Sequence, residues 1–297
     1  MNKFKILNTI KKVYENNGNI IQYLKDLEGQ KHNSLEDILI SYDFQAGSYI
    51  ESYKKQPKIK DRYCKKLAQT IDNMGDYNSL MEVGVGEATT LGNILKLMKN
   101  KSALSYGFDI SWSRIKYAKK FLKKQNLDKV NLFVGDLFCL PLKDNSIDIV
   151  YTSHSIEPNG GKEKEALMEL YRITNKYLIL LEPAYEYANE ESKNRMIHHG
   201  YVTNLYSTAK ELGYEIIEHK LFGINSNSLN PTGLMIIKKD FKTKETEPMC
   251  CPITKKSLTL KNNCYFSKDS LLLYPIIDGI PFFLPQNAIL ASKFLDE

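Results

Sequence analysis

Short apolar runs alternate with amphipathic stretches through the middle of the chain, from about residue 79 to residue 238. This alternation is typical of βαβ units that build a mainly parallel sheet, so it predicts an α/β fold. The candidate strands are 79–83, 103–108, 130–134, 147–152, 177–181, 214–221 and 233–238, and clear helices fit 115–124 and 162–174. The last two strands are joined by a loop too short for a crossover helix, which predicts an antiparallel hairpin.

The flanking segments follow other patterns. Residues 1–78 show helical spacing of apolar positions and predict a helical cap before the main domain at 79–240. Within the cap, residues 42–53 are rich in aromatic side chains, which suits either a lid over a pocket or a helix packed on the main domain. The charged stretch 238–248 predicts a linker, and a small unit follows at 249–297.

Composition narrows the class of protein. The 297 residues suffice for one large domain and a small one, and no apolar run approaches the ~18 to 20 residues of a membrane-spanning helix. The net charge of +6 is too mild to indicate nucleic-acid binding by itself. The five cysteines are an odd number and fit reduced thiols better than a disulfide framework. The first residues lack the apolar stretch of a secretory signal, so we expect a cytoplasmic protein that does not bind membranes.

Polar residues follow successive predicted strands where a parallel sheet binds its ligands. Gly84 and Gly86 follow the first strand and permit a tight turn with close backbone approach to a ligand. Thr89 stands where the dinucleotide fingerprint requires Gly or Ala, which disfavours plain NAD binding. Asp109 ends the second strand, where a carboxylate can accept from ribose hydroxyls, and Asp136 ends the third, where one can bind an adenine amine. Each residue alone also fits a turn or a helix cap.

Taken together, residues 79–238 resemble the S-adenosylmethionine-dependent methyltransferases. The matching positions are Glu82, Gly84, Gly86, Asp109, the pair Gly135 and Asp136, the segment 140–148, and the pair Glu182 and Pro183. This resemblance implies a Rossmann-like, seven-stranded, mostly parallel sheet, with the helical cap and a small C-terminal α+β unit attached. It also implies S-adenosylmethionine as cofactor. One departure is Ala88, where many members have a third glycine.

The resemblance assigns the donor site residue by residue. It implies that Glu82, Gly84 and Gly86 hold the methionine part and that Asp109, with Ile110 beside it, binds the ribose. Asp136 and Leu137 are expected at the adenine, and Ser153 is expected to complete the donor site at the end of the fourth strand.

Methyl transfer requires alignment, and a hydroxyl or protonated amine acceptor also requires a base. His154 and Glu157 directly follow the fourth predicted strand and are candidates for the base and for orienting the acceptor. A second candidate group, His198, His199 and Tyr201, follows the fifth strand. A hydrogen-bonded structural histidine is the alternative for His154. The Asn-rich loop 225–232 returns at the same edge and suits either a polyhydroxylated acceptor or a solvated turn.

The C-terminal segment, with the ending Tyr274-Pro-Ile-Ile-Asp-Gly-Ile-Pro281, resembles the small zinc-ribbon-like proteins that activate methyltransferases. A tetrahedral zinc site requires paired ligands, but Thr254 stands where the second cysteine of a Cys-x-x-Cys pair belongs. Cys264 also lacks a partner two residues on. We therefore expect no metal, the alternative being a site improvised from Cys250, Cys251, Cys264 and a histidine.

The favoured hypothesis is an enzyme that methylates oxygen or nitrogen of a small polar acceptor, with a sugar of a bacterial surface glycan as the candidate. An RNA or protein methyltransferase that docks substrate or partner through the C-terminal unit is the alternative. The sequence disfavours nucleic acid because it lacks an Asn-Pro-Pro-Tyr type motif and a basic stretch interleaved with aromatics. A scaffold without activity is a third interpretation, and a homo-oligomer is compatible with the sequence.

Overall fold

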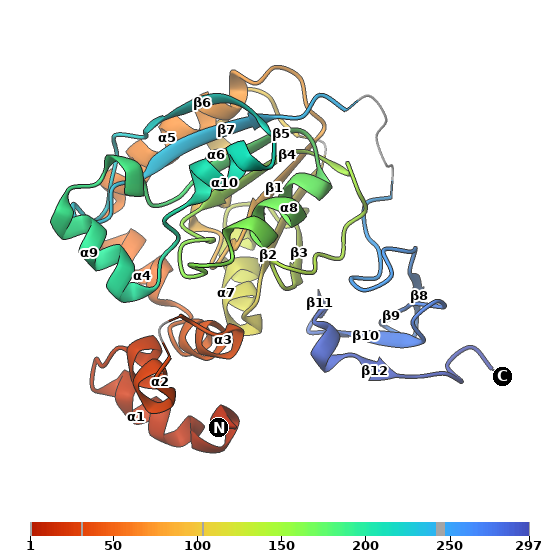
Figure 1. The fold of residues 1–297 in the computed structure, drawn as a ribbon. Coiled ribbons are helices and arrows are strands. Elements are labelled where there is room, and N and C mark those ends of the chain that lie inside the picture. The colour runs from red at the N-terminus through yellow and green to blue at the C-terminus, as the bar shows by residue number, and fades with distance from the viewer. Residues whose placement is uncertain (1, 31, 103, 242–246, 297) are drawn as a thin grey trace.

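The computed structural model describes residues 2–30, 32–102, 104–241 and 247–296. Its centre is a seven-stranded sheet with the order β3-β2-β1-β4-β5-β7-β6 (Figure 1). The strands are β1 (Ser79–Val83), β2 (Leu104–Asp109), β3 (Asn131–Val134), β4 (Ile147–Ser153), β5 (Thr174–Leu181), β6 (Glu215–Leu221) and β7 (Gly233–Lys238). The first five run parallel, whereas β7 pairs antiparallel with both β5 and β6. The predicted α/β fold and the final hairpin are therefore confirmed.

Helices cover both faces of this sheet, which explains why β1 is buried along its whole length. One face packs against α5 (Pro57–Asp72), α6 (Thr89–Leu97) and α7 (Trp112–Lys123). The opposite face packs against α8 (Glu163–Ile173) and α10 (Leu205–Glu211). The turn η2 (Tyr185–Tyr187) and α9 (Glu190–His199) follow β5. No helix in the described part of the chain has both the length and the apolar character needed to cross a bilayer.

The N-terminal segment forms a small helical layer with its own core. It comprises η1 (Lys3–Ile6), α1 (Leu7–Glu15), α2 (Ile20–Glu28), α3 (Leu35–Phe44) and α4 (Ser48–Lys55). Ile10, Ile20, Leu24 and Ile40 are buried together between these helices. The helix α5 also falls within the predicted cap range 1–78, yet its buried face packs into the core of the sheet.

Two carboxylates fasten this layer to the sheet domain. Asp43 on α3 accepts hydrogen bonds from the hydroxyls of Ser111 and Ser113 at the start of α7. Glu87, fully buried after β1, accepts from three backbone N–H groups, those of residues 47, 49 and 50. Because these three N–H groups lie at the start of α4, the carboxylate also stabilises the helix dipole and fixes where α4 lies.

The C-terminal unit is a second, antiparallel sheet beside the edge strand β3 (Figure 1). Its strands are β8 (Thr259–Lys261), β9 (Cys264–Phe266), β10 (Leu272–Ile277), β11 (Ile280–Pro281) and β12 (Ile289–Leu290), with the turn η3 (Pro285–Asn287). The N–H of Phe283 donates to the carbonyl of Val134, and the Phe283 ring contacts Phe133 edge-on at 6.0 Å.

The structure differs from the α+β prediction for this unit, because its described residues form strands and a 3-10 turn but no α-helix. Closely spaced turns divide the segment into stretches too short for an amphipathic helix. Of the predicted linker at 238–248, residues 242–246 lie outside the described residues.

Candidate active site

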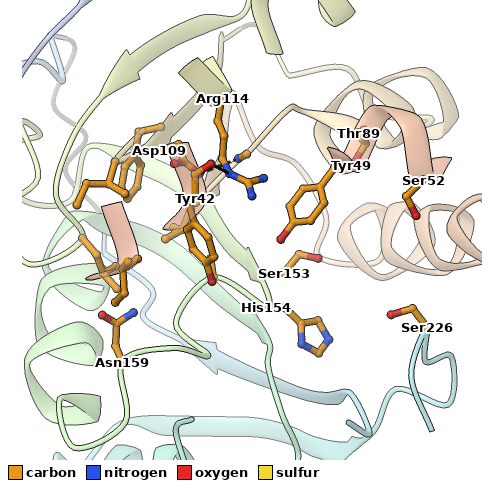
Figure 2. Close-up of a pocket in the computed structure, with 18 of the residues that line it drawn as sticks. Tyr42, Tyr49, Ser52, Thr89, Asp109, Arg114, Ser153, His154, Asn159 and Ser226 are labelled. Carbon is orange, nitrogen blue, oxygen red and sulfur yellow. Dashed lines mark hydrogen bonds between the residues drawn. The ribbon is translucent and has the colours of Figure 1, made fainter. Parts of the chain in front are cut away.

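A cavity of about 390 Å³ opens at the carboxyl edge of the parallel strands (Figure 2). Residues from the ends of β1, β2, β3 and β4 line one side of it, and tyrosines of the N-terminal helices line the other. The predicted donor residues that line it are Gly84, Gly86, Asp109, Ile110, Asp136, Leu137 and Ser153. The structure thus gathers these residues, which come from four strand ends, around one space.

The turn after β1 requires glycine. Gly84 and Gly86 have φ of +59° and +53°, in the left-handed region that L side chains rarely adopt. A Cβ added to Gly84 would lie 2.4 Å from the Cβ of Ser155. A side chain at position 84 would therefore collide with the loop after β4, so only glycine fits there.

Asp109 closes this turn from the end of β2. Its carboxylate accepts hydrogen bonds from the N–H of Gly86 at 3.1 Å and the N–H of Ser111 at 2.9 Å. Burial raises its pKa. At the end of β3, Asp136 accepts from the N–H of Phe138 at 3.0 Å, and burial raises its pKa as well. Each carboxylate keeps acceptor capacity that faces the cavity, which suits hydroxyl and amine donors of a ligand.

Glu82 does not line the cavity, so its contact with the methionine part stays a prediction. It is buried within the sheet, where its carboxylate accepts a hydrogen bond from the hydroxyl of Tyr151 at 2.9 Å. Burial raises its pKa to about 7. The side chain points below the glycine turn because neighbouring residues of a strand alternate between faces.

His154 lies just beyond β4 with a left-handed backbone, φ +57°. Its Nδ1 lies 2.5 Å from the carboxylate of Glu157, and its Nε2 lies 2.8 Å from the hydroxyl of Thr232. Burial alone would lower the pKa of His154, but the hydrogen bond and charge of Glu157 outweigh it and the pKa is raised. Conversely, His154 lowers the pKa of Glu157 against the effect of burial.

A carboxylate at the end of β5 holds in place the loop that carries His154 and Glu157. Glu182, at the end of β5, accepts from the N–H groups of Ser155, Ile156 and Glu157 at 3.0, 3.2 and 3.0 Å. Three bonds of this kind fix the strained backbone beside His154 and aim its ring at the cavity. The Asn-rich loop also takes part, since the amide of Asn230 donates to Glu157 at 3.0 Å.

The second predicted group, His198, His199 and Tyr201, does not face one cavity as a whole. His199 and Tyr201 line a neighbouring cavity of about 320 Å³, together with Glu157, and their rings stack at 5.3 Å. Burial lowers the pKa of His199. The His198 side chain is exposed and lines neither cavity, so its catalytic role stays a prediction that this geometry does not support. Adjacent residues of a helix point about 100° apart, so only one of the two histidines faces inward.

The sequence left two interpretations open for the aromatic stretch 42–53, a lid over a pocket or a helix packed on the main domain, and it did not indicate Arg114 as a site residue. Tyr42 and Tyr49 flank the guanidinium of Arg114, whose Cζ lies 4.9 and 4.3 Å from their ring centroids (Figure 2). The aromatic density at 42–53 was the available signal, and these residues both pack on the main domain and line the cavity. Arg114 is 1% exposed, and its Nη1 and Nη2 have no hydrogen-bond partner, although Nη1 lies 3.6 Å from Glu87. A buried cation with unused donors at a cavity wall fits an anionic ligand group.

In the C-terminal unit, the thiol at the first position of the incomplete Cys-x-x-Cys pair contacts hydroxyl groups. The Cys251 thiol lies 3.5 Å from the hydroxyls of both Ser270 and Tyr274. Burial alone would raise its pKa, but hydrogen bonds from Ser270 and Thr254 lower it to about 6. Among the described residues, no group of three or more His, Cys, Asp or Glu side chains could hold a metal ion.

Comparison with known proteins agrees with this geometry. The sequence family described as "Methyltransferase domain" matches residues 80–176. An uncharacterized 37.1 kDa protein in transposon TN4556 of Streptomyces fradiae is 30% identical over 95 residues. That match covers 32% of this chain and 26% of the relative, so the chain matches about a quarter of the relative's length.

Two solved structures show the same fold. A putative S-adenosyl-L-methionine-dependent methyltransferase from Methanococcus maripaludis is 15% identical with a TM-score of 0.50, covering 69% of this chain and 96% of that one. A chain from the complex between the Haloferax volcanii Trm112 methyltransferase activator and a putative methyltransferase is 14% identical with a TM-score of 0.51. It covers 67% of this chain and 99% of that one. Residues 80–176 therefore match the family described as a methyltransferase domain, and the sheet domain has the same fold as these two structures.

Proposed function

We propose that this chain transfers a methyl group from S-adenosylmethionine to an oxygen or nitrogen of a small polar acceptor, with a sugar of a bacterial surface glycan as the candidate. The observation that carries the proposal is the His154–Glu157 pair at the wall of the cavity formed by the donor-type residues. A paired histidine with a raised pKa in this position suits removal of a proton from an acceptor.

The first cavity fits the methyl donor. Gly84 and Gly86 leave backbone open toward the ligand, and Asp109 and Asp136 supply acceptors for hydroxyl and amine groups. The unused guanidinium donors of Arg114 suit the carboxylate of the methionine part. Bound there, S-adenosylmethionine supplies an electrophilic methyl group, and the enzyme's residues align the acceptor and manage its proton.

His154 is the proposed base. Glu157 accepts the hydrogen bond from Nδ1, so the lone pair stays on Nε2, the nitrogen beside Thr232. An acceptor hydroxyl or ammonium that displaces the Thr232 contact would give its proton to Nε2. The resulting imidazolium is stabilised by the Glu157 carboxylate, because an opposite charge within hydrogen-bond distance favours the protonated ring.

The polar character of the acceptor side supports a small hydrophilic acceptor. Asn159, Ser226 and Thr232 line the first cavity on the side of His154. Amide and hydroxyl groups both donate and accept hydrogen bonds, so they match the hydroxyls of a sugar.

The alternative is an RNA or protein methyltransferase that uses the C-terminal unit for docking. It is favoured by apolar side chains exposed on that unit, among them Leu290 at 74% and Leu260 at 60% exposure. On this alternative, the C-terminal unit would bind the RNA or protein substrate and hold it near the site while it packs on β3. Its resemblance to methyltransferase activators fits this role.

The test is turnover of a panel of amino and acidic sugars by the wild type and by His154→Ala, with S-adenosylhomocysteine affinity measured on both. We expect turnover to fall about 100-fold or more while product affinity stays unchanged. Normal turnover in the variant would reject His154 as the base. Methylation of RNA with a rate that falls steeply with salt would instead support the alternative, because RNA binding depends on many phosphate contacts.

A further inference from the structure

The second cavity lies between the N-terminal helices and α9, next to the site just described. It has a volume of about 320 Å³ and shares Tyr42 and Tyr49 with the first cavity. The two cavities also meet at the catalytic pair, because His154 lines the first and its partner Glu157 lines the second. A molecule in the second cavity is therefore adjacent to the proposed base.

The second cavity carries a positive charge. Lys25, only 4% exposed, and Arg195 both line it, and within the described residues neither forms an ion pair. Lys25 donates to the backbone carbonyl of His198, at 3.1 Å. Among the described residues of the lining, Glu157 is the one carboxylate, and it is already engaged by His154 and by Asn230. Two cations with unused hydrogen-bond donors in the lining of one cavity attract an anionic group.

Two buried polar atoms in the lining lack partners. The Nη1 of Arg195 is a donor without an acceptor, although its guanidinium Cζ lies 5.5 Å from the Tyr201 ring centroid. The Oδ1 of Asn33 is an acceptor without a donor, and this side chain is only 7% exposed. The amide of Asn33 is fixed, because its Nδ2 donates to the carbonyls of Pro158 and His199 at 2.8 and 3.2 Å. Buried polar groups are almost always hydrogen bonded, so both atoms point to a ligand.

We propose that the second cavity binds the carboxylate of the acceptor, so that the methylated molecule is a polyhydroxylated carboxylic acid such as a sugar acid. The carboxylate would accept from Arg195 and Lys25, and a neighbouring hydroxyl would donate to Asn33 Oδ1. The rest of the acceptor extends past Tyr42 and Tyr49 and brings its reacting hydroxyl or amine to His154. This inference rests on the proposed function, because it names the acceptor class for that site.

The test compares acids with neutral analogues by calorimetry on the full chain. The probes are D-glucuronate against D-glucuronamide and N-acetylneuraminate against its methyl ester, each titrated with and without S-adenosylhomocysteine. We expect at least one acid to bind about 10- to 100-fold more tightly than its neutral partner, since a carboxylate forms charge-assisted hydrogen bonds. In Arg195→Gln this preference should shrink about 10-fold or more.

A matched control keeps the result interpretable. Lys193→Gln removes one positive charge from the same helix but outside the lining, so it should keep the preference for acids. Thermal unfolding of both variants checks that they fold. If Arg195→Gln fails to fold, the comparison of acids with neutral analogues on the wild type still tests the proposal.

The inference is overturned if no acid binds at millimolar concentration, if acids and neutral analogues bind alike, or if a folded Arg195→Gln keeps the full preference. Failure of the proposed function is a separate result. It would show as absence of S-adenosylhomocysteine binding to the wild type, whatever the acids do.

Discussion

Replacement of Gly84 by alanine tests whether the turn after β1 has the geometry described. Two energies oppose the substitution. A left-handed backbone at φ +59° costs an L residue about 1–2 kcal/mol. The new Cβ would also lie 2.4 Å from the Cβ of Ser155, well inside the 3.4–4 Å of ordinary contact. Overpacking of this kind costs about 1–3 kcal/mol.

The two terms predict that Gly84→Ala lowers the free energy of unfolding by about 2–5 kcal/mol, a large share of the roughly 5–15 kcal/mol of a typical protein. Urea unfolding followed by circular dichroism measures the change. Because Gly84 lines the cavity proposed to hold the methyl donor, calorimetry should also show weaker S-adenosylhomocysteine binding.

Two further variants separate the terms. Gly213 has φ +73° with no atom within 4 Å of an added Cβ, so Gly213→Ala should show only the backbone cost. Adding Ser155→Gly to Gly84→Ala removes the clashing Cβ, and it loses no hydrogen bond because the Ser155 hydroxyl is buried without a partner. The double variant should therefore regain about 1–3 kcal/mol. The reasoning is refuted if Gly84→Ala is no worse than Gly213→Ala, or if Ser155→Gly restores nothing.

Four other predictions concern binding, pH and metal. Asp109→Asn should weaken S-adenosylhomocysteine about 10- to 100-fold by calorimetry, through loss of a charge-assisted bond, and unchanged affinity would contradict its role. Glu157→Gln should move the rising limb of the rate–pH profile to lower pH, because the base must be neutral and Glu157 raises the pKa of His154; an unmoved limb would rule out His154. The His154–Glu157 pair should also stabilise the fold most between pH 4.5 and 6.5. Above this window the contribution of His154 is lost as the pH rises through its raised pKa, and below it the contribution of Glu157 is lost as the pH falls through its lowered pKa. The purified protein should hold no stoichiometric zinc and should keep its unfolding midpoint in chelator; one zinc per chain with loss of folding on removal would refute this.

The sequence by itself determined the sheet and the position of the residues that we propose bind the methyl donor. The strands predicted at 79–83 and 233–238 coincide with β1 and β7, and the others differ from the observed strands by one to three residues at an end. Apolar runs bounded by turn residues are local signals, and parallel strands all present their carboxyl ends at one edge. Asp109 and Asp136 could therefore be placed beside the glycine turn before any contact was known.

The tertiary structure decided what closes the site and what faces it. Arg114 lies between Tyr42 and Tyr49, residues about 70 positions earlier in the chain, and no local pattern links them. The same holds for Lys25, which lines one cavity with Arg195 and donates a hydrogen bond to the carbonyl of His198 on α9. Local patterns also could not choose between His198 and His199, since the choice depends on which face of α9 is covered. Contacts between distant segments depend on how whole elements pack, and this is fixed by the sum of many weak interactions over the entire chain.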